Sequence, residues 1–199
     1  MFSLAKEKKF GSIIIGVDEV GRGPLAGPVT AAAVILNDNI SLDKINDSKK
    51  LSSLQRESIF NQIIINSKCA IGFATVSEID KLNILQASLL AMKRSVESLK
   101  EKKAIILIDG KFSYDKNNEN IKTFIKGDQL YPSIAAASII AKVVRDRYMT
   151  LMSEKYQNYG WDKNAGYGTK KHILAIKEYG ITPAHRKSFA PIHNMLLQK

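Results

Sequence analysis

Four acidic side chains follow apolar segments that are typical of buried strands. Asp18 and Glu19 end the run at residues 13–17, Asp109 ends the run at residues 104–108, and Asp128 comes three residues after the run at residues 121–125. In open α/β sheets, ligands bind in the crevice beyond the carboxyl ends of the strands. If the first and fourth strands are neighbours, Asp18 and Asp109 meet at one edge of the sheet.

Such a group of carboxylates has a chemical use. Converging negative charges repel each other, raise each other's pKa and destabilise the fold unless a cation balances them. All-oxygen ligation suits Mg²⁺ or Mn²⁺ better than Zn²⁺. Two such ions about 4 Å apart can activate water and stabilise the leaving oxygen in phosphodiester hydrolysis. The residues therefore predict a divalent-metal site, with a solvated strand end as the alternative for any one carboxylate alone.

The turn after the first carboxylates allows a second interpretation. Gly21-x-Gly23-x-x-Ala26 fits the loose dinucleotide-binding pattern, which would indicate a nicotinamide or flavin oxidoreductase. However, Asp18 and Glu19 would repel a pyrophosphate there. Pro28 also begins a strand pattern where a helix should start. Both features disfavour this alternative.

The elements that position these residues alternate between strand and helix patterns. We expect strands at residues 13–18, 28–36, 70–76, 104–108 and 121–125, and helices at 52–66, 83–99, from Pro132 onward and 169–180. This order predicts an α/β fold with a central mixed five-stranded sheet flanked by helices, antiparallel at first and parallel after a crossover. We expect one domain over residues 1–199, with a core at about 12–160 and a helical, substrate-contacting part at about 161–199.

Charge and composition favour a nucleic-acid partner. The net charge is +11, and residues 100–199 hold 18 Lys and Arg against 9 Asp and Glu. This asymmetry suggests a basic face for a polyanion, although a merely basic soluble protein is the alternative. The lone Cys69 permits no internal disulfide, and no apolar run reaches the ~20 residues of a membrane span. With no signal-peptide pattern, we expect a soluble cytoplasmic protein without a membrane partner.

Several motifs, in order, give the chain a family resemblance. They occupy residues 16–28 (GVDEVGRGPLAGP), 47–51 (DSKKL), 82–85 (LNIL), 108–110 (IDG), 127–128 (GD), 133–142 (SIAAASIIAK), 166–169 (GYGT) and 185–189 (HRKSF). Through them the chain resembles bacterial ribonuclease HII over about residues 12–190. Arg22 favours this family over the related ribonuclease HIII, and Val20 stands where the family often has alanine.

The resemblance implies a ribonuclease H-like fold and a type 2 endoribonuclease. Such an enzyme cuts RNA in RNA–DNA hybrids and cuts 5′ of single ribonucleotides in duplex DNA, leaving a 3′-hydroxyl and a 5′-phosphate. It serves ribonucleotide excision repair and DNA replication. The resemblance also implies that Mn²⁺ or Mg²⁺ is bound by the catalytic carboxylates Asp18, Glu19, Asp109 and Asp128.

For the substrate, the resemblance implies that Gly21, Arg22 and Gly23 grip the backbone and sense the 2′-hydroxyl that separates RNA from DNA. Tyr167 would stack on the sugar of the neighbouring deoxynucleotide. Lys49 and Lys50 could contact phosphates, or form an exposed, solvated pair.

Some alternatives stay open on the sequence alone. A non-catalytic nucleic-acid-binding protein of the same fold is one, although all four carboxylates are present. His185 and Arg186 could form a structural tie or contact substrate. The last residues contain no clear sliding-clamp-binding motif, and we expect a monomer.

Overall fold

A mixed five-stranded sheet forms the centre of the protein. The computed structural model describes residues 2–42, 45 and 52–197. The strands, in spatial order, are β3 (Ser67–Ala74), β2 (Val29–Leu36), β1 (Ile14–Val20), β4 (Ile105–Asp109) and β5 (Ile121–Phe124). β1 pairs antiparallel with β2, as β2 does with β3, whereas β1–β4 and β4–β5 are parallel. The predicted mixed sheet, with an antiparallel and a parallel section, is confirmed.

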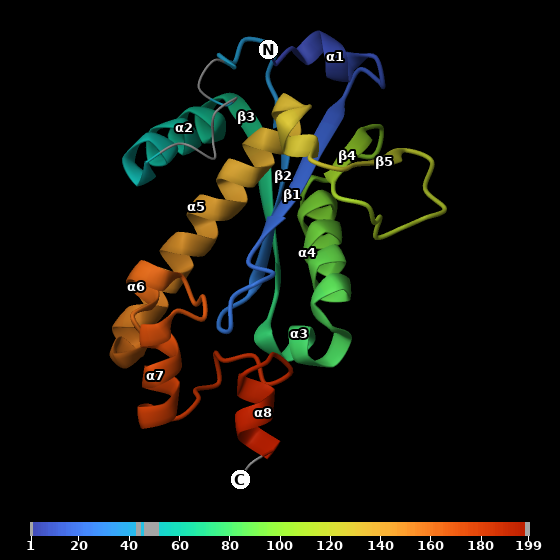
Figure 1. Cartoon of the computed structure of the whole chain (residues 1–199). Helices are drawn as coiled ribbons and strands as arrows, with labels where there is room; N and C mark the ends of the chain where they lie inside the picture. Colours follow the sequence, from blue (N-terminus) through green and yellow to red (C-terminus); the bar gives the residue numbers. More distant parts are fainter. Residues whose placement is uncertain (1, 43–44, 46–51, 198–199) are drawn as a thin grey trace.

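Helices cover both faces of this sheet (Figure 1). The helices are α1 (Leu4–Lys8), α2 (Ser53–Asn66), α3 (Val76–Leu82), α4 (Ile84–Leu99), α5 (Pro132–Lys155), α6 (Trp161–Asn164), α7 (Lys170–Tyr179) and α8 (Ile192–Leu197), with 3₁₀ turns η2 (Gly127–Gln129) and η3 (Gln157–Tyr159). α4 packs on one face, and α2 and α5 pack on the other. Within the described ranges, no helix is both long and apolar enough to cross a bilayer.

The alternation of β1 divides its side chains between the two faces. Ile15 and Val17 belong to the core beneath α4. Gly16 faces α5 so closely that an added Cβ would lie 2.1 Å from the backbone carbon of Ser133. The absence of a side chain at Gly16 therefore lets the backbone of α5 rest directly on β1, two residues before Asp18.

Local signals correctly placed several helix ends. Ser52 and Gln55 form the predicted capping box of α2, and the Asn83 side chain caps α4. Pro132 occupies the first turn of α5, and Thr169 caps α7, which ends at Gly180.

Two strands, β1 and β3, differ from the prediction by more than one residue at an end. β1 continues through Glu19 and Val20, because both residues still pair with β2, so the carboxylates lie within the strand rather than at its end. β3 covers residues 67–74 instead of 70–76. A capping box between Thr75 and Glu78 then begins α3, a helix that the sequence pattern did not reveal.

The C-terminal part packs against the far end of α5 (Figure 1). α5 is 24 residues long, and its second half reaches a separate apolar cluster around Met149, Tyr159 and Trp161. The segment between α7 and α8 returns to the start of β2, where Ala26 and His185 form an isolated β-bridge. This return segment, residues 182–189, brings the end of the chain next to the turn that follows β1.

Candidate active site

The sheet brings three of the four predicted carboxylates together. Val17 of β1 pairs with Ile108 of β4 in a parallel register, so the next residues, Asp18 and Asp109, are level on adjacent strands. Glu19 follows Asp18 and feels the charge of Asp109 as well. As predicted, β1 and β4 are neighbours, and this register brings the positions of Asp18 and Asp109 to the same edge of the sheet.

Burial and like charge disfavour ionisation of this group. Burial raises the pKa of Asp18 well above its ordinary value, and the neighbouring charges of Glu19 and Asp109 raise it further. Two donors offset part of this effect: the Glu19 backbone N–H donates to Asp18 Oδ1 at 2.7 Å, and the Ser138 hydroxyl of α5 also donates to Asp18. Without a bound cation, the ionised carboxylates of Asp18, Glu19 and Asp109 therefore repel one another.

Glu19 has one oxygen satisfied and one available. Its Oε1 accepts a bond from Arg22 Nη1 at 3.2 Å, while its Oε2 is buried and has no hydrogen-bond partner. Burial raises the pKa of Glu19 despite the positive charge of Arg22. An orphaned, buried carboxylate oxygen beside two other carboxylates fits a hard cation, because such ions take oxygen ligands.

Asp128 directly follows Gly127, a residue that is hydrogen-bonded to Asp109. Asp109 Oδ1 accepts a 2.6 Å hydrogen bond from the backbone N–H of Gly127, which begins η2, and Asp128 itself is buried. Across the described residues, no three His, Cys, Asp or Glu side chains are already grouped tightly enough to hold an ion. The four carboxylates thus occupy neighbouring elements at one edge of the sheet, without a closed cage in this conformation.

The turn after β1 is built on a buried arginine. Gly21 has a φ of +100°, and a Cβ there would lie 2.2 Å from Arg145 Nε. Arg145 is fully buried on α5 and donates to the carbonyl oxygens of Pro28 (3.0 Å), Ala26 (3.1 Å) and Ala165 (2.9 Å). Only glycine fits at position 21 without moving this guanidinium.

A second buried arginine fixes which way the turn faces. Arg186 donates through Nη2 to the carbonyl oxygen of Gly21 and through Nη1 to that of Arg22, the latter at 3.0 Å. In a trans peptide, the next N–H points away from its carbonyl. The N–H groups of Arg22 and Gly23 therefore face away from Arg186, and two successive outward N–H groups can bind an anion.

Tyr167 lies directly against this turn. Its Cε1 atom is 3.4 Å from the place where a Cβ on Gly23 would stand, and 45% of the residue is exposed. The loop of Tyr167 is joined to the turn segment because the N–H of Leu25 donates to the carbonyl oxygen of Gly166 at 2.8 Å. Arg22, Gly23 and Tyr167 are thus neighbours, as a shared substrate role requires.

The remaining sequence candidates divide into three groups. Lys49 and Lys50 lie outside the described residues. His185 and Arg186 are fully buried, which favours the structural-tie alternative over substrate contact. Sequence reasoning missed Ser138 and Arg145, because their partners are far away along the chain and only the packing of α5 brings them close.

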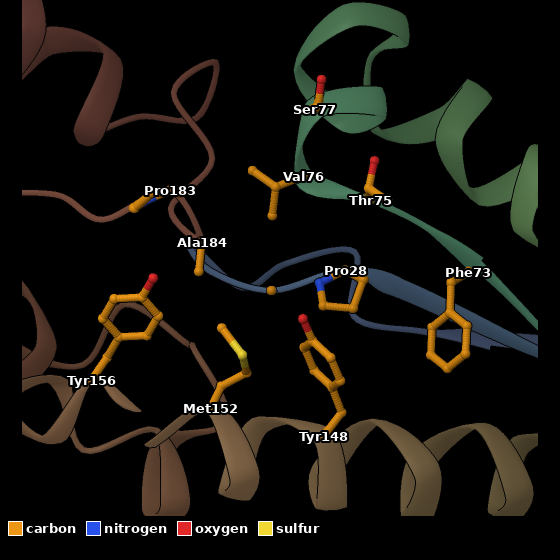
Figure 2. Close-up of a pocket in the computed structure, with 11 residues that line it drawn as sticks. Pro28, Phe73, Thr75, Val76, Ser77, Tyr148, Met152, Tyr156, Pro183 and Ala184 are labelled. Atoms are coloured by element: carbon orange, nitrogen blue, oxygen red, sulfur yellow. The ribbon is translucent and has the colours of Figure 1, made fainter. Parts of the chain in front are cut away.

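A separate apolar cavity lies behind the turn. It measures about 500 Å³, and Figure 2 shows Tyr148 and Met152 of α5, with Tyr156 just after the helix, facing Val76 and the return segment's Ala184 across it. None of the four carboxylates lines this cavity. The chemistry expected of the chain therefore belongs to the sheet edge and not to this cavity.

The fold also decides the dinucleotide alternative. A dinucleotide site needs a helix that begins at the glycine turn. Here the chain instead enters β2, antiparallel to β1. The oxidoreductase interpretation is therefore rejected.

Comparison with known proteins identifies the family. The family model described as ribonuclease HII matches residues 15–192, nearly the whole chain. The chain belongs to the ribonuclease HII family. It is accordingly a type 2 ribonuclease H endonuclease that acts on RNA–DNA substrates, and the resemblance drawn from its motifs is confirmed.

Individual relatives agree with this assignment. A ribonuclease HII from Pelagibacter ubique (strain HTCC1062) is 55% identical over 184 residues, which cover 92% of this chain and 99% of that protein. The crystal structure of ribonuclease H2 from Pyrococcus horikoshii OT3 has a TM-score of 0.77 and 28% identity, covering 94% of this chain and 98% of that one. Bst-RNase HIII in complex with Mn²⁺ has a TM-score of 0.74 at 21% identity, covers 97% of this chain and 72% of that one, and supports the fold alone. The ribonuclease H-like fold is confirmed.

Proposed function

We propose that this ribonuclease HII family member cuts 5′ of single ribonucleotides in duplex DNA and within the RNA strand of hybrids, leaving a 3′-hydroxyl and a 5′-phosphate. Its metal ligands and catalytic carboxylates are Asp18, Glu19, Asp109 and Asp128. One observation carries this assignment: Asp18, Glu19 and Asp109 repel one another at one sheet edge, and the buried Oε2 of Glu19 lacks a partner.

The donor set favours Mn²⁺ or Mg²⁺ as the cofactor. All candidate ligands are carboxylate oxygens, which hard divalent cations prefer, and a protein of the same fold is known in complex with Mn²⁺. When bound, such a cation supplies Lewis-acid chemistry, activating water and stabilising the leaving oxygen. The chain's own residues place the ligands: the β1–β4 register aligns Asp18 with Asp109, and Ser138 orients Asp18.

Substrate selection is assigned to the turn and to Tyr167. The outward N–H groups of Arg22 and Gly23, together with the half-exposed Arg22 side chain, suit a phosphate of the cleaved strand. Close approach at Gly21 and Gly23 lets the backbone sense the 2′-hydroxyl. Tyr167, beside Gly23, is placed to stack on the next sugar. Lys49 and Lys50 remain proposed phosphate contacts.

The cellular setting is part of the proposal. Residues 100–199 hold 18 Lys and Arg but only 9 Asp and Glu, and this positive charge supports binding of a nucleic-acid duplex. We expect a monomer. A cytoplasmic role in ribonucleotide excision repair and DNA replication is consistent with the substrate.

The decisive experiment uses two labelled duplexes, one with a lone ribonucleotide and one with an all-RNA strand, each in Mg²⁺ and in Mn²⁺. We expect both to be cut, and Asp109→Asn to bind them while cutting at least ~10³-fold more slowly, because a ligand of the electrostatic centre is lost. Lys177→Gln, on α7 and away from these contacts, is the matched control. Unchanged cleavage by Asp109→Asn would refute the carboxylate assignment, and binding without any metal-dependent cut would restore the non-catalytic alternative.

A further inference from the structure

Two histidines form a buried pair in the C-terminal part, and the catalytic proposal does not use them. His172 of α7 and His185 of the return segment are both fully buried. Their Nε2 atoms lie 3.1 Å apart, and the indole Nε1 of Trp161 is 3.0 Å from His172 Nε2. Buried polar rings that contact each other directly must share their protons in a defined way.

The surrounding donors determine where each proton sits. The backbone N–H of Thr182 donates to His185 Nδ1 at 2.9 Å, so the His185 proton is on Nε2 and points at His172. His172 Nε2 accepts from both Trp161 and His185, so the His172 proton is on Nδ1. That Nδ1 lies 2.9 Å from the carbonyl oxygen of Tyr167 and must donate to it.

The result is a one-directional hydrogen-bond relay that ends on Tyr167. It runs from Thr182 through His185 and His172 to the Tyr167 carbonyl, with Trp161 joining at His172. The relay requires both rings to be neutral. Burial lowers the pKa of both, that of His185 to about 4, which keeps them neutral near pH 7.

Tyr167 needs such an anchor because of its surroundings. It stands between Gly166 and Gly168, whose backbones are intrinsically permissive, and its side chain extends outward beside Gly23. Its backbone N–H donates to the Asn164 carbonyl oxygen, and its carbonyl oxygen accepts from the Thr169 N–H and from His172. Of these, only the His172 bond connects Tyr167 to the return segment that also carries Arg186.

The return segment is therefore connected both to the Gly21–Gly23 turn and to Tyr167. Arg186 holds the carbonyls of Gly21 and Arg22, while His185 reaches Tyr167 through His172. Figure 2 shows the same segment, at Ala184, passing beside the chain that leads into Pro28.

We infer that His172, oriented by His185 and Trp161, is a positioning residue that fixes Tyr167 at the spacing from the Gly21–Gly23 turn that reading the sugar requires. This inference rests on the substrate role proposed above for Tyr167. A purely structural role is the competing explanation, since removing any buried histidine can weaken the fold.

Two substitutions of His172 separate these explanations. An asparagine side chain places an amide at the position of Nδ1, so His172→Asn can still donate to Tyr167. A glutamine side chain reaches the position of Nε2 instead, so His172→Gln keeps that contact and loses the bond to Tyr167. We expect His172→Gln to lower kcat/KM on the lone-ribonucleotide duplex about tenfold, equivalent to ~1.4 kcal/mol. His172→Asn should recover at least about a third of the original value.

A double-mutant cycle with Tyr167→Ala provides the decisive test. Because His172 acts through Tyr167, His172→Gln should change kcat/KM less than about twofold in the Tyr167→Ala background. His185→Leu, which removes the group that orients His172, should cost about threefold alone and nothing further in that background, and it replaces His172→Gln if that variant does not fold. His193→Gln, an exposed histidine of α8, is the matched control and should behave like the unmodified protein.

The outcomes are distinguishable. A cooperative urea unfolding transition, followed by the fluorescence of Trp161, the only tryptophan of the chain, checks that each variant is folded under assay conditions. If folded His172→Gln loses the same factor with and without Tyr167, or if His172→Asn fails as severely as His172→Gln, the positioning role is refuted while the function of Tyr167 stands. If Tyr167→Ala is fully active, the substrate role of Tyr167 itself is refuted, and this inference with it.

Discussion

The two glycines of the turn after β1 should respond very differently to the same added methyl group. At Gly21, φ is +100° and a new Cβ would lie 2.2 Å from Arg145 Nε and 2.6 Å from its Cδ. At Gly23, φ is not in the left-handed region and the nearest atom is Tyr167 Cε1 at 3.4 Å. The turn thus contains its own comparison between a glycine whose place leaves no room for a Cβ and one whose place does.

The magnitude follows from these contacts. A non-glycine residue in the left-handed region costs about 1–3 kcal/mol. Displacing the Arg145 guanidinium, which has three backbone acceptors, breaks at least one charged hydrogen bond worth roughly 1.5–3 kcal/mol. Gly21→Ala should therefore reduce the free energy of unfolding by about 3–5 kcal/mol. Gly23→Ala should cost less than ~1 kcal/mol, because the half-exposed Tyr167 ring can move.

Urea denaturation with a common m-value measures both effects. Gly110→Ala is the control for backbone strain alone, since Gly110 has a φ of +104° and no atom within 4 Å of an added Cβ. We expect an intermediate loss there, of about 1–2 kcal/mol. Gly23→Ala, although folded, should cut the lone-ribonucleotide duplex several-fold more slowly because it displaces Tyr167. If Gly21→Ala is as stable as Gly110→Ala, the role assigned to Arg145 is wrong.

Three further predictions concern charge. Asp18→Asn should raise the melting temperature of the metal-free protein at pH 7 and abolish the rise that Mn²⁺ produces, because it removes one of the repelling carboxylates; a melting temperature below that of the unmodified protein would contradict this. The pKa of His185 is about 4 in the folded protein, against an ordinary value of 6.5. The unfolded chain therefore takes up a proton first on acidification, and the stability that is complete above pH 6.5 falls by about 3 kcal/mol by pH 4. The stability difference between the unmodified protein and His185→Leu should accordingly shrink over that range in urea titrations. Glu7 accepts 2.8 Å bonds from both the N–H and the hydroxyl of Ser133 at the start of α5, so Glu7→Ala should cost about 2–3 kcal/mol in thermal unfolding, whereas Glu7→Gln, which keeps an acceptor, should cost less than ~1 kcal/mol.

The sequence predicted those parts of the fold that short-range rules control. Capping residues placed the starts of α2, α4 and α7, and continuous apolar runs placed the strands that carry Asp18 and Asp109. The end of β1 was misplaced because a charged residue usually marks a strand end, whereas Glu19 is retained within the strand by its pairing with Ala31. A buried carboxylate in a ladder is a cost that only a functional site explains.

Contacts between distant residues could not be predicted in the same way. Ser138 and Arg145 stand among ordinary helix-forming residues, and nothing nearby shows that one reaches Asp18 and the other supports Gly21. The unpredicted helix α3 matters for the same reason. Its Asp80 accepts hydrogen bonds from the backbone N–H groups of Lys187 and Ser188, at 3.0 and 2.9 Å, and thereby holds the return segment.

The contacts that hold the catalytic carboxylates differ from those that hold the residues proposed to recognise the ribonucleotide. The carboxylates are fixed by the register of β1 with β4 and by Ser138. The turn is fixed by Arg145 of α5 and by Arg186 of the return segment, and Tyr167 is linked to that segment through His172 and His185. Because the two sets of supports do not share a residue, a change in the return segment can alter how the sugar is read while the metal ligands stay in place. Selectivity should therefore vary in this enzyme more readily than cleavage itself, and substitutions at residues 182–186 should change the ratio of lone-ribonucleotide to all-RNA cleavage before they abolish either.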